Sequence, residues 1–301
     1  MKRTDLALEV RESIPEDNKE IQGVVLEKNT DEEKQMEITK VLIKDAQGAK
    51  VMGKPIGTYI TIEAWALEKK LESYYDELVK TIKDYVEELA GGIMDKSVLI
   101  VGLGNREVTP DALGPKVIDE LYTTRHLIKE FGQEFKEKHG LKTMSALAPG
   151  VMAQTGMESR EIIKGIVEET RPDLIIVLDA LAARSVNRLN CTIQLTDTGI
   201  SPGSGVGNNR KALNKDSLGI PVIAIGVPTV VDADTIVEDR MESMLEGQGF
   251  SEQEIQSFLD ELNAHAMKNM FVTPKNVDEA VSQISSILAE ALNDCFVPKA
   301  V

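Results

Sequence analysis

The 301-residue sequence has only two cysteines, Cys191 and Cys295, and neither belongs to a C-x-x-C pair. Because so few cysteines cannot form a disulfide framework, we expect the protein in a reducing, cytoplasmic compartment. Long apolar runs are also missing, and a membrane-spanning helix needs about 20 apolar residues in succession. Residues 2–9 are too rich in charge for the apolar core of a secretory signal, so we expect no membrane partner.

The chain also has fewer basic than acidic residues. The chain has 34 Lys and Arg against 50 Asp and Glu, a formal net charge of −16, with 4% aromatic residues. An acidic surface of this kind repels the phosphate backbone and attracts basic partners. We therefore expect no direct binding to nucleic acid.

Two common motifs are absent. There is no H-E-x-x-H for a zinc peptidase and no G-x-x-x-x-G-K-[ST] for a P-loop. The three histidines, His126, His139 and His265, lie on expected helices or at a helix end without the spacing of metal ligands. Among hydrolases, these absences favour carboxylate chemistry.

Three segments in the first quarter of the chain alternate apolar and polar residues, over 21–27, 36–43 and 58–63. Alternation over this length predicts half-buried, antiparallel strands. From 63 to 89, apolar residues instead recur at helical spacing, which predicts a helix that ends at Gly91 and Gly92.

From residue 97 onward, short continuous apolar runs begin at Val98, Leu174 and Ile220. Such runs are typical of strands buried on both faces of a parallel sheet. Helices are expected over 110–138, 158–170, 251–269 and 276–294. The sequence therefore predicts one α/β domain: a doubly wound, mostly parallel sheet with helices on both faces, plus a β-rich N-terminal elaboration over about 15–65.

Two aspartates stand where the chemistry of such a sheet is expected. In open α/β sheets, ligands bind outside the carboxyl ends of the strands. Asp111 follows the first buried run through the loop NREVTP, and Asp179 closes the run LIIVLD. Because both strands are expected to be parallel members of one sheet, both carboxylates should emerge at the same edge.

Each aspartate also has a plain structural interpretation. Asp111 follows Thr109 and Pro110, the pattern of a helix N-terminus in which an acidic residue faces the positive end of the helix dipole. Asp179 could cap the segment after it, or pair with Arg184 or Arg188. A carboxylate that follows four apolar residues is nevertheless costly to bury without a partner.

If the two carboxylates approach each other, they form an acid/base pair suited to peptide hydrolysis. Like charges a few Å apart do not both ionise easily, so the pair holds one proton. The ionised member can then take a proton from water while the protonated member donates to the carbonyl oxygen.

Two glycine-rich segments leave other options open. Gly102-Leu-Gly104 follows a strand as in a dinucleotide-binding turn, but Glu107 replaces the third glycine of G-x-G-x-x-G and would oppose a pyrophosphate. Residues 201–208 (SPGSGVGN) could offer backbone N–H groups to a substrate carbonyl or an anion, or form only a turn.

Long strings of the sequence are similar to one known family. The chain resembles the germination proteases of spore-forming bacteria, and the resemblance covers nearly the whole chain. It is carried by RTDLALE at 3–9, VGLGN and VTPDALGP within 101–115, APGVMAQTGMES at 148–159, LDALAARS at 178–185, TGISPGSGVGN at 198–208 and LGIPVIAIGVPTVVDA at 218–233.

The resemblance implies an atypical aspartic endopeptidase that cuts small acid-soluble spore proteins during germination. The two aspartates implicated in the family fall on Asp111 and Asp179. The family is made as an inactive homotetrameric zymogen in the forespore and removes its own propeptide. Here the cut is expected near Asp5–Leu6, which leaves residues 1–5 as a short propeptide and 6–301 as a single α/β peptidase domain.

The expected scaffold also resembles the hydrogenase maturation peptidases, in which acidic residues and a histidine gather a metal. No histidine follows the strand in VIAIGVPTVVDA. We therefore expect no metal and no cofactor. A metal-dependent maturation peptidase and a nucleotide-binding α/β protein remain as alternatives.

Overall fold

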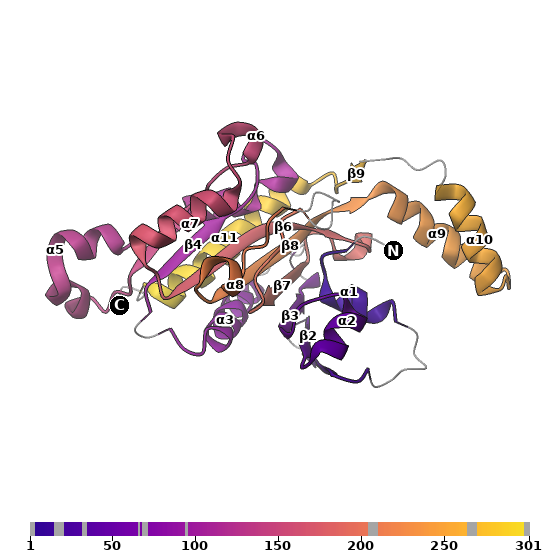
Figure 1. The fold of residues 1–301 in the computed structure, drawn as a ribbon, viewed down its shortest axis with the longest axis horizontal. Coiled ribbons are helices and arrows are strands. Elements are labelled where there is room, and N and C mark those ends of the chain that lie inside the picture. The colour runs from indigo at the N-terminus through magenta and orange to yellow at the C-terminus, as the bar shows by residue number, and fades with distance from the viewer. Residues whose placement is uncertain are drawn as a thin grey trace.

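The computed structural model describes residues 4–14, 21–31, 35–65, 67, 72–93, 96–203, 210–263 and 270–297 (Figure 1). Within these residues one nine-stranded sheet runs through the molecule in the order β1-β2-β3-β7-β8-β6-β4-β5, and β9 pairs with β8. The strands are β1 (Val24–Asp31), β2 (Met36–Ile43), β3 (Gly57–Glu63), β4 (Val98–Gly102), β5 (Met144–Leu147), β6 (Leu174–Ala183), β7 (Thr192–Thr196), β8 (Val222–Asp232) and β9 (Phe271–Val272).

The sheet is mixed. It is parallel over β5-β4-β6-β8 and antiparallel over β8-β7-β3-β2-β1. The α/β class and the antiparallel N-terminal strands are confirmed, whereas "mostly parallel" describes only one half. The N-terminal strands continue the main sheet because β7, a strand that the sequence did not predict, joins β3 to β8.

Helices cover both faces of the parallel half. Along β4, Val98 and Ile100 pack into one core with α3 (Glu72–Leu89), α4 (Leu113–Asp119) and α11 (Val277–Phe296). The alternate residues Leu99 and Val101 pack on the other face with α7 (Ser159–Thr170) and α8 (Lys215–Leu218). Alternate residues of one continuous apolar run therefore pack into the cores on opposite faces of the sheet, which confirms the doubly wound arrangement.

The expected helix over 110–138 is divided in two, α4 and α5 (Arg125–Lys138). Tertiary hydrogen bonds hold the turn between them: the Tyr122 N–H donates to Asn293 Oδ1 at 2.9 Å, and the Thr124 N–H donates to the Met144 carbonyl at 3.0 Å. The other expected helices correspond to α3, α7, α10 (Glu252–Asn263) and α11. Residues 264–269, including His265, lie outside the described residues.

The remaining helices were not anticipated. They are α1 (Ala7–Glu12), α2 (Ala46–Met52), α6 (Met152–Thr155) and α9 (Ala233–Gly247), which with α10 forms a hairpin that projects from the body of the molecule (Figure 1). No described helix combines the length and the apolarity needed to cross a bilayer. Cys191 and Cys295 are both buried and unbonded to each other.

Candidate active site

Asp111 lies in the short 3-10 helix η3 (Thr109–Asp111), just after the loop that follows β4. The loop holds its carboxylate, because the Asn105 N–H donates to Asp111 Oδ2 at 2.7 Å. Strand β8 holds its backbone, because the Thr229 hydroxyl donates to the Pro110 carbonyl at 2.7 Å. Helix α4 has no side-chain cap, so Asp111 caps the loop and does not cap α4.

Two glycines let this loop approach η3 closely. Gly104 has φ +118°, and a Cβ there would lie 1.9 Å from the Asp111 carbonyl oxygen. A Cβ on Gly102 would lie 2.2 Å from the Gly114 carbonyl oxygen. Both glycines of VGLGN are therefore explained by backbone packing, which removes the main support for the nucleotide-binding alternative.

Asp179 is buried in β6, with 6% of its surface exposed. Burial, and then the carboxylates of Asp111 and Asp5, hold the pKa of Asp179 well above its ordinary value. The Ala180 N–H, which donates to Asp179 Oδ1 at 3.1 Å, and the Arg210 charge act in the opposite direction. The structure therefore brings Asp111 and Asp179 within electrostatic reach of each other at one site.

Strand β6 does not end at Asp179, as expected from the sequence, but continues to Ala183 through a register shift against β8. The two arginines considered as partners of Asp179 pair with other carboxylates. Arg184 contacts Asp239 and Glu242, and Arg188 contacts Glu9, Glu12 and Glu63. Neither arginine therefore neutralises Asp179.

Burial also raises the pKa of Asp111, although the Asn105 N–H and the Arg210 charge both favour its ionised form. Arg210 was not anticipated from the sequence. Its Nε is buried and has no hydrogen-bond partner among the described residues. Both carboxyl groups therefore have raised pKa values, and Asp179 is the one whose anion is disfavoured by burial and by two neighbouring carboxylates.

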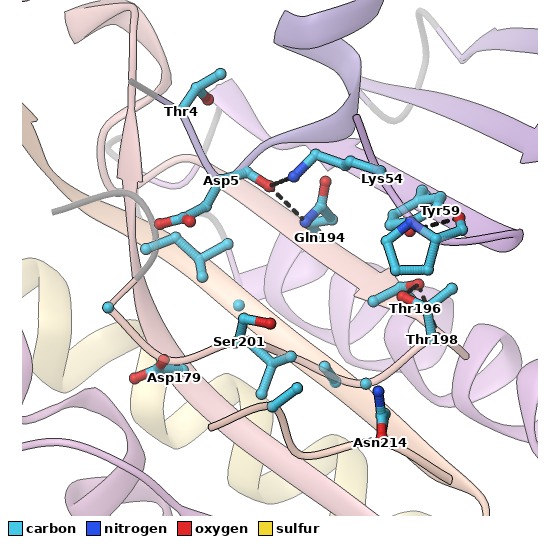
Figure 2. A pocket seen from close by; sticks show the side chains of 18 of the residues that line it. Thr4, Asp5, Lys54, Tyr59, Asp179, Gln194, Thr196, Thr198, Ser201 and Asn214 are labelled. Atoms are coloured by element: carbon cyan, nitrogen blue, oxygen red, sulfur yellow. Dashed lines mark hydrogen bonds between the residues drawn. The ribbon is translucent and has the colours of Figure 1, made fainter. Parts of the chain in front are cut away.

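Asp179 opens onto a cavity of about 300 Å³ between β6, β7, β8 and the N-terminal segment (Figure 2). Both polar and apolar residues line the cavity. Its labelled lining residues besides Asp179 are Thr4, Asp5, Lys54, Tyr59, Gln194, Thr196, Thr198, Ser201 and Asn214. Residues 201 and 203 of the glycine-rich segment also line the cavity, whereas 204–208 lie outside the described residues.

The N-terminal segment lies along β6 beside Asp179. The Asp5 N–H donates to the Ala182 carbonyl at 3.0 Å, and the Ala182 N–H donates to Asp5 Oδ2 at 2.9 Å. Leu6 is fully buried. Its neighbours in that small core are Leu181, Ala183 and Val231. Asp5 is therefore held against β6 by hydrogen bonds, and Leu6 by apolar packing.

The carbonyl of Asp5 points to two side chains. Lys54 Nζ donates to the Asp5 carbonyl oxygen at 2.9 Å, and Gln194 Nε2 donates to it at 3.3 Å (Figure 2). The other end of the Gln194 amide accepts from the Ala7 N–H at 2.7 Å. Sequence reasoning missed both residues, because a lysine between Gly53 and Pro55 and an amide within a five-residue strand have no distinctive pattern.

A metal site is not evident in the part of the chain that the structure describes, since no group of three or more His, Cys, Asp or Glu side chains there could hold an ion. His126 lies on α5 and His139 caps its end. The expectation that the chemistry needs no metal remains a prediction.

Residues 1–267 match the model of the germination protease family. The chain belongs to that family. Germination proteases of Caldanaerobacter subterraneus subsp. tengcongensis and Clostridium perfringens are each 42% identical to it, covering 98% and 99% of this chain and 94% and 96% of their own. A germination protease of Bacillus cytotoxicus is 40% identical, covering 97% of this chain and 92% of its own. The chain is therefore a peptidase of spore germination.

Among solved structures, the chain is similar to the [NiFe] hydrogenase maturation protease HycI of Thermococcus kodakarensis. The TM-score is 0.34 at 16% identity, over 69% of this chain and 99% of that one. The fold class of this germination protease accordingly rests on the sheet order and the two-sided helix packing described above.

Proposed function

We propose that the chain is an aspartic-type endopeptidase that begins the degradation of small acid-soluble spore proteins, with Asp111 and Asp179 as its carboxylate pair. The observation that carries the proposal is a buried Asp179 that lines a cavity and whose pKa is raised by burial and by the charge of Asp111. Titratable groups perturbed by burial and by a specific charge partner are typical of active sites. The substrate class follows from the resemblance to the family.

The two carboxylates differ in environment, and the difference assigns their roles. Asp111, which accepts the Asn105 N–H, is the ionised base that takes a proton from the attacking water. Asp179 is the acid that gives its proton to the substrate. The hydroxide portion of the water forms a bond to the carbonyl carbon, and the carbon–nitrogen bond then breaks. One water is consumed for each peptide bond cut.

The same cavity offers a reason why the uncut chain would be an inactive zymogen. The bond between Asp5 and Leu6 lies where a substrate would, held by β6 on one side and by Lys54 and Gln194 on the other. While the segment occupies the cavity, no other substrate can enter along β6. Cutting Asp5–Leu6 would release residues 1–5 and open the site. A homotetramer in the forespore and spore core, as in the family, completes the proposal, and sedimentation of the purified chain tests the tetramer.

The decisive experiment compares two variants on a purified small acid-soluble spore protein. Asp111→Asn and Asp179→Asn should each reduce kcat by at least about 100-fold, because each removes one member of a unit that moves protons together. Asp173→Asn is the matched control, since Asp173 accepts hydrogen bonds from Ser97 and lies before β6. Full activity in both active-site variants would exclude the pair. Loss of cleavage on chelation, restored by added metal, would instead favour the maturation-peptidase alternative.

A further inference from the structure

The two donors on the Asp5 carbonyl oxygen come from parts of the chain far apart in sequence. Lys54 follows α2, whose last residue is capped by Gly53 in the left-handed conformation, φ 59°. Tyr59 fixes the next residue, because its hydroxyl donates to the Pro55 carbonyl at 2.9 Å. Gln194 lies in the middle of β7 with 7% of its surface exposed. Both side chains are therefore positioned by rigid elements.

The Gln194 amide holds the chain on both sides of Leu6. Its oxygen accepts from the N–H of Ala7, and its nitrogen donates to the carbonyl of Asp5. These two contacts orient the amide, and the second of them lies on the carbonyl of the bond between Asp5 and Leu6. The carbonyl oxygen of that bond thus receives one N–H from an amide and one from an amine.

Burying the Lys54 amine costs free energy unless the amine makes a compensating interaction. Burial lowers the pKa of Lys54, whereas the carboxylates of Asp5 and Glu9 raise it. Lys54 Nζ nevertheless points at a backbone carbonyl, 2.9 Å away. A carbonyl is a weak partner for a buried amine in the ground state, but it becomes a strong one when negative charge develops on its oxygen.

We propose that Lys54 and Gln194 form the oxyanion hole of this enzyme, an inference that rests on the proposed function and deepens it. Water adds to the Asp5 carbonyl carbon and gives one proton to the Asp111 carboxylate. The electron pair of the carbonyl moves to its oxygen, where the Lys54 amine and the Gln194 amide hold the charge. When the carbonyl re-forms, the bond to the Leu6 nitrogen breaks, and that nitrogen takes the proton of Asp179. The new carboxylic acid gives its proton to the new amine, and the proton now on Asp111 moves to Asp179, which restores the pair.

The experiment follows self-cleavage of the full-length chain by mass spectrometry, as a first-order rate constant. Lys54→Met keeps the length of the side chain and removes its N–H donors. Gln194→Glu keeps the acceptor for the Ala7 N–H and replaces the donor with a negative charge. Each variant should cut at Asp5–Leu6 about 100-fold more slowly or worse, the effect of removing one oxyanion donor. Lys40→Met, at a surface ion pair with Glu88, is the matched control and should cut at the unaltered rate.

A second measurement separates catalysis from simple anchoring of the segment. Hydrogen exchange of the Ala7 amide is measured in an Asp111→Asn background, with and without Lys54→Met. Slow cutting with unchanged protection supports the oxyanion hole. Slow cutting that is matched by an equal loss of protection means that Lys54 only anchors the segment, and it overturns the inference.

The remaining outcomes are equally distinct. If Lys54→Met fails to fold, as judged by its thermal unfolding, Gln194→Glu alone decides. If the unaltered chain cuts itself and both variants cut as fast, the oxyanion hole is wrong while the proposed function stands. If the unaltered chain does not cut at Asp5–Leu6 at any pH but still cuts a small acid-soluble spore protein, the inference is wrong while the proposed function stands; if it cuts neither, both are wrong.

Discussion

Two hydrogen bonds join Asp5 to Ala182. The Asp5 N–H donates to the Ala182 carbonyl at 3.0 Å, and the Ala182 N–H donates to the side-chain Oδ2 of Asp5 at 2.9 Å. These bonds hold Asp5 against β6 three residues beyond Asp179. The position of the N-terminal segment is therefore set by the same strand that positions the buried carboxyl.

We expect a bell-shaped dependence of cleavage on pH. Activity needs Asp111 ionised and Asp179 protonated, so it is highest between the two apparent pKa values of the pair. Because the pKa of Asp179 is raised well above its ordinary value, the alkaline limb should fall at a pH well above that of a free carboxyl. The measurement is kcat/KM on a spore-protein substrate across pH. A rate that stays constant as the pH rises would contradict this assignment.

Replacing the buried carboxyl should stabilise the protein at alkaline pH. The folded-state pKa of Asp179 lies above the unfolded value, so its contribution to stability is complete below the unfolded pKa and is lost as the pH rises through the folded pKa. Each unit of the shift amounts to about 1.4 kcal/mol. Urea unfolding should therefore find Asp179→Asn more stable than the unaltered chain at pH 8, and the difference should shrink at acid pH.

Asp173 provides a control in which the pH dependence of stability is expected to have the opposite sign. Hydrogen bonds from Ser97 lower its pKa, so its contribution is present above the unfolded pKa and is lost as the pH falls through the folded pKa. Asp173→Asn should slightly destabilise the chain at pH 8 and have no effect at strongly acid pH. If both substitutions shift stability in the same direction at pH 8, the linkage argument fails.

The carboxylates around Arg188 should make this arginine important for stability. Glu9 and Glu63 have 2% and 8% exposed side chains, and Arg188 lies 3.5 and 3.1 Å from them. Arg188→Met leaves two buried carboxylates without their cation and should cost about 3–5 kcal/mol of unfolding free energy. Arg106→Met breaks an exposed pair with Asp119 and should cost less than about 1 kcal/mol. Equal losses in urea unfolding would contradict the difference in burial.

Gly104 should tolerate no side chain. A Cβ would meet the Asp111 carbonyl oxygen at 1.9 Å, and φ is +118°. Gly104→Ala should cost at least about 2 kcal/mol and displace Asp111, so cleavage falls along with stability. Gly165 lies inside α7 with nothing within 4 Å of a Cβ. Gly165→Ala should instead add about 0.5–1 kcal/mol without changing the rate of cleavage.

Local patterns predicted much of the framework. The alternating segments became β1, β2 and β3, and the apolar runs became β4, β6 and β8, because side-chain periodicity reports how many faces of a strand are buried. The short strands β5 and β7 were missed, because a segment of four or five residues is too short to show a clear hydrophobic periodicity. The break between α4 and α5 was also missed, because its hydrogen bonds reach Asn293 and Met144.

By itself, the sequence determined the α/β class and singled out Asp111 and Asp179 as candidates, because both depend on local order along the chain and on parallel strands sharing an edge. Only the tertiary structure decided what surrounds them. Lys54, Gln194 and Arg210 come from a turn, an antiparallel strand and a loop. Lys54 and Gln194 meet at Asp5 because β7 joins the N-terminal strands to the parallel half of the sheet. Burial and neighbouring charge, Arg210 included, then shift the pKa values of Asp111 and Asp179, and both effects depend on contacts distant in sequence.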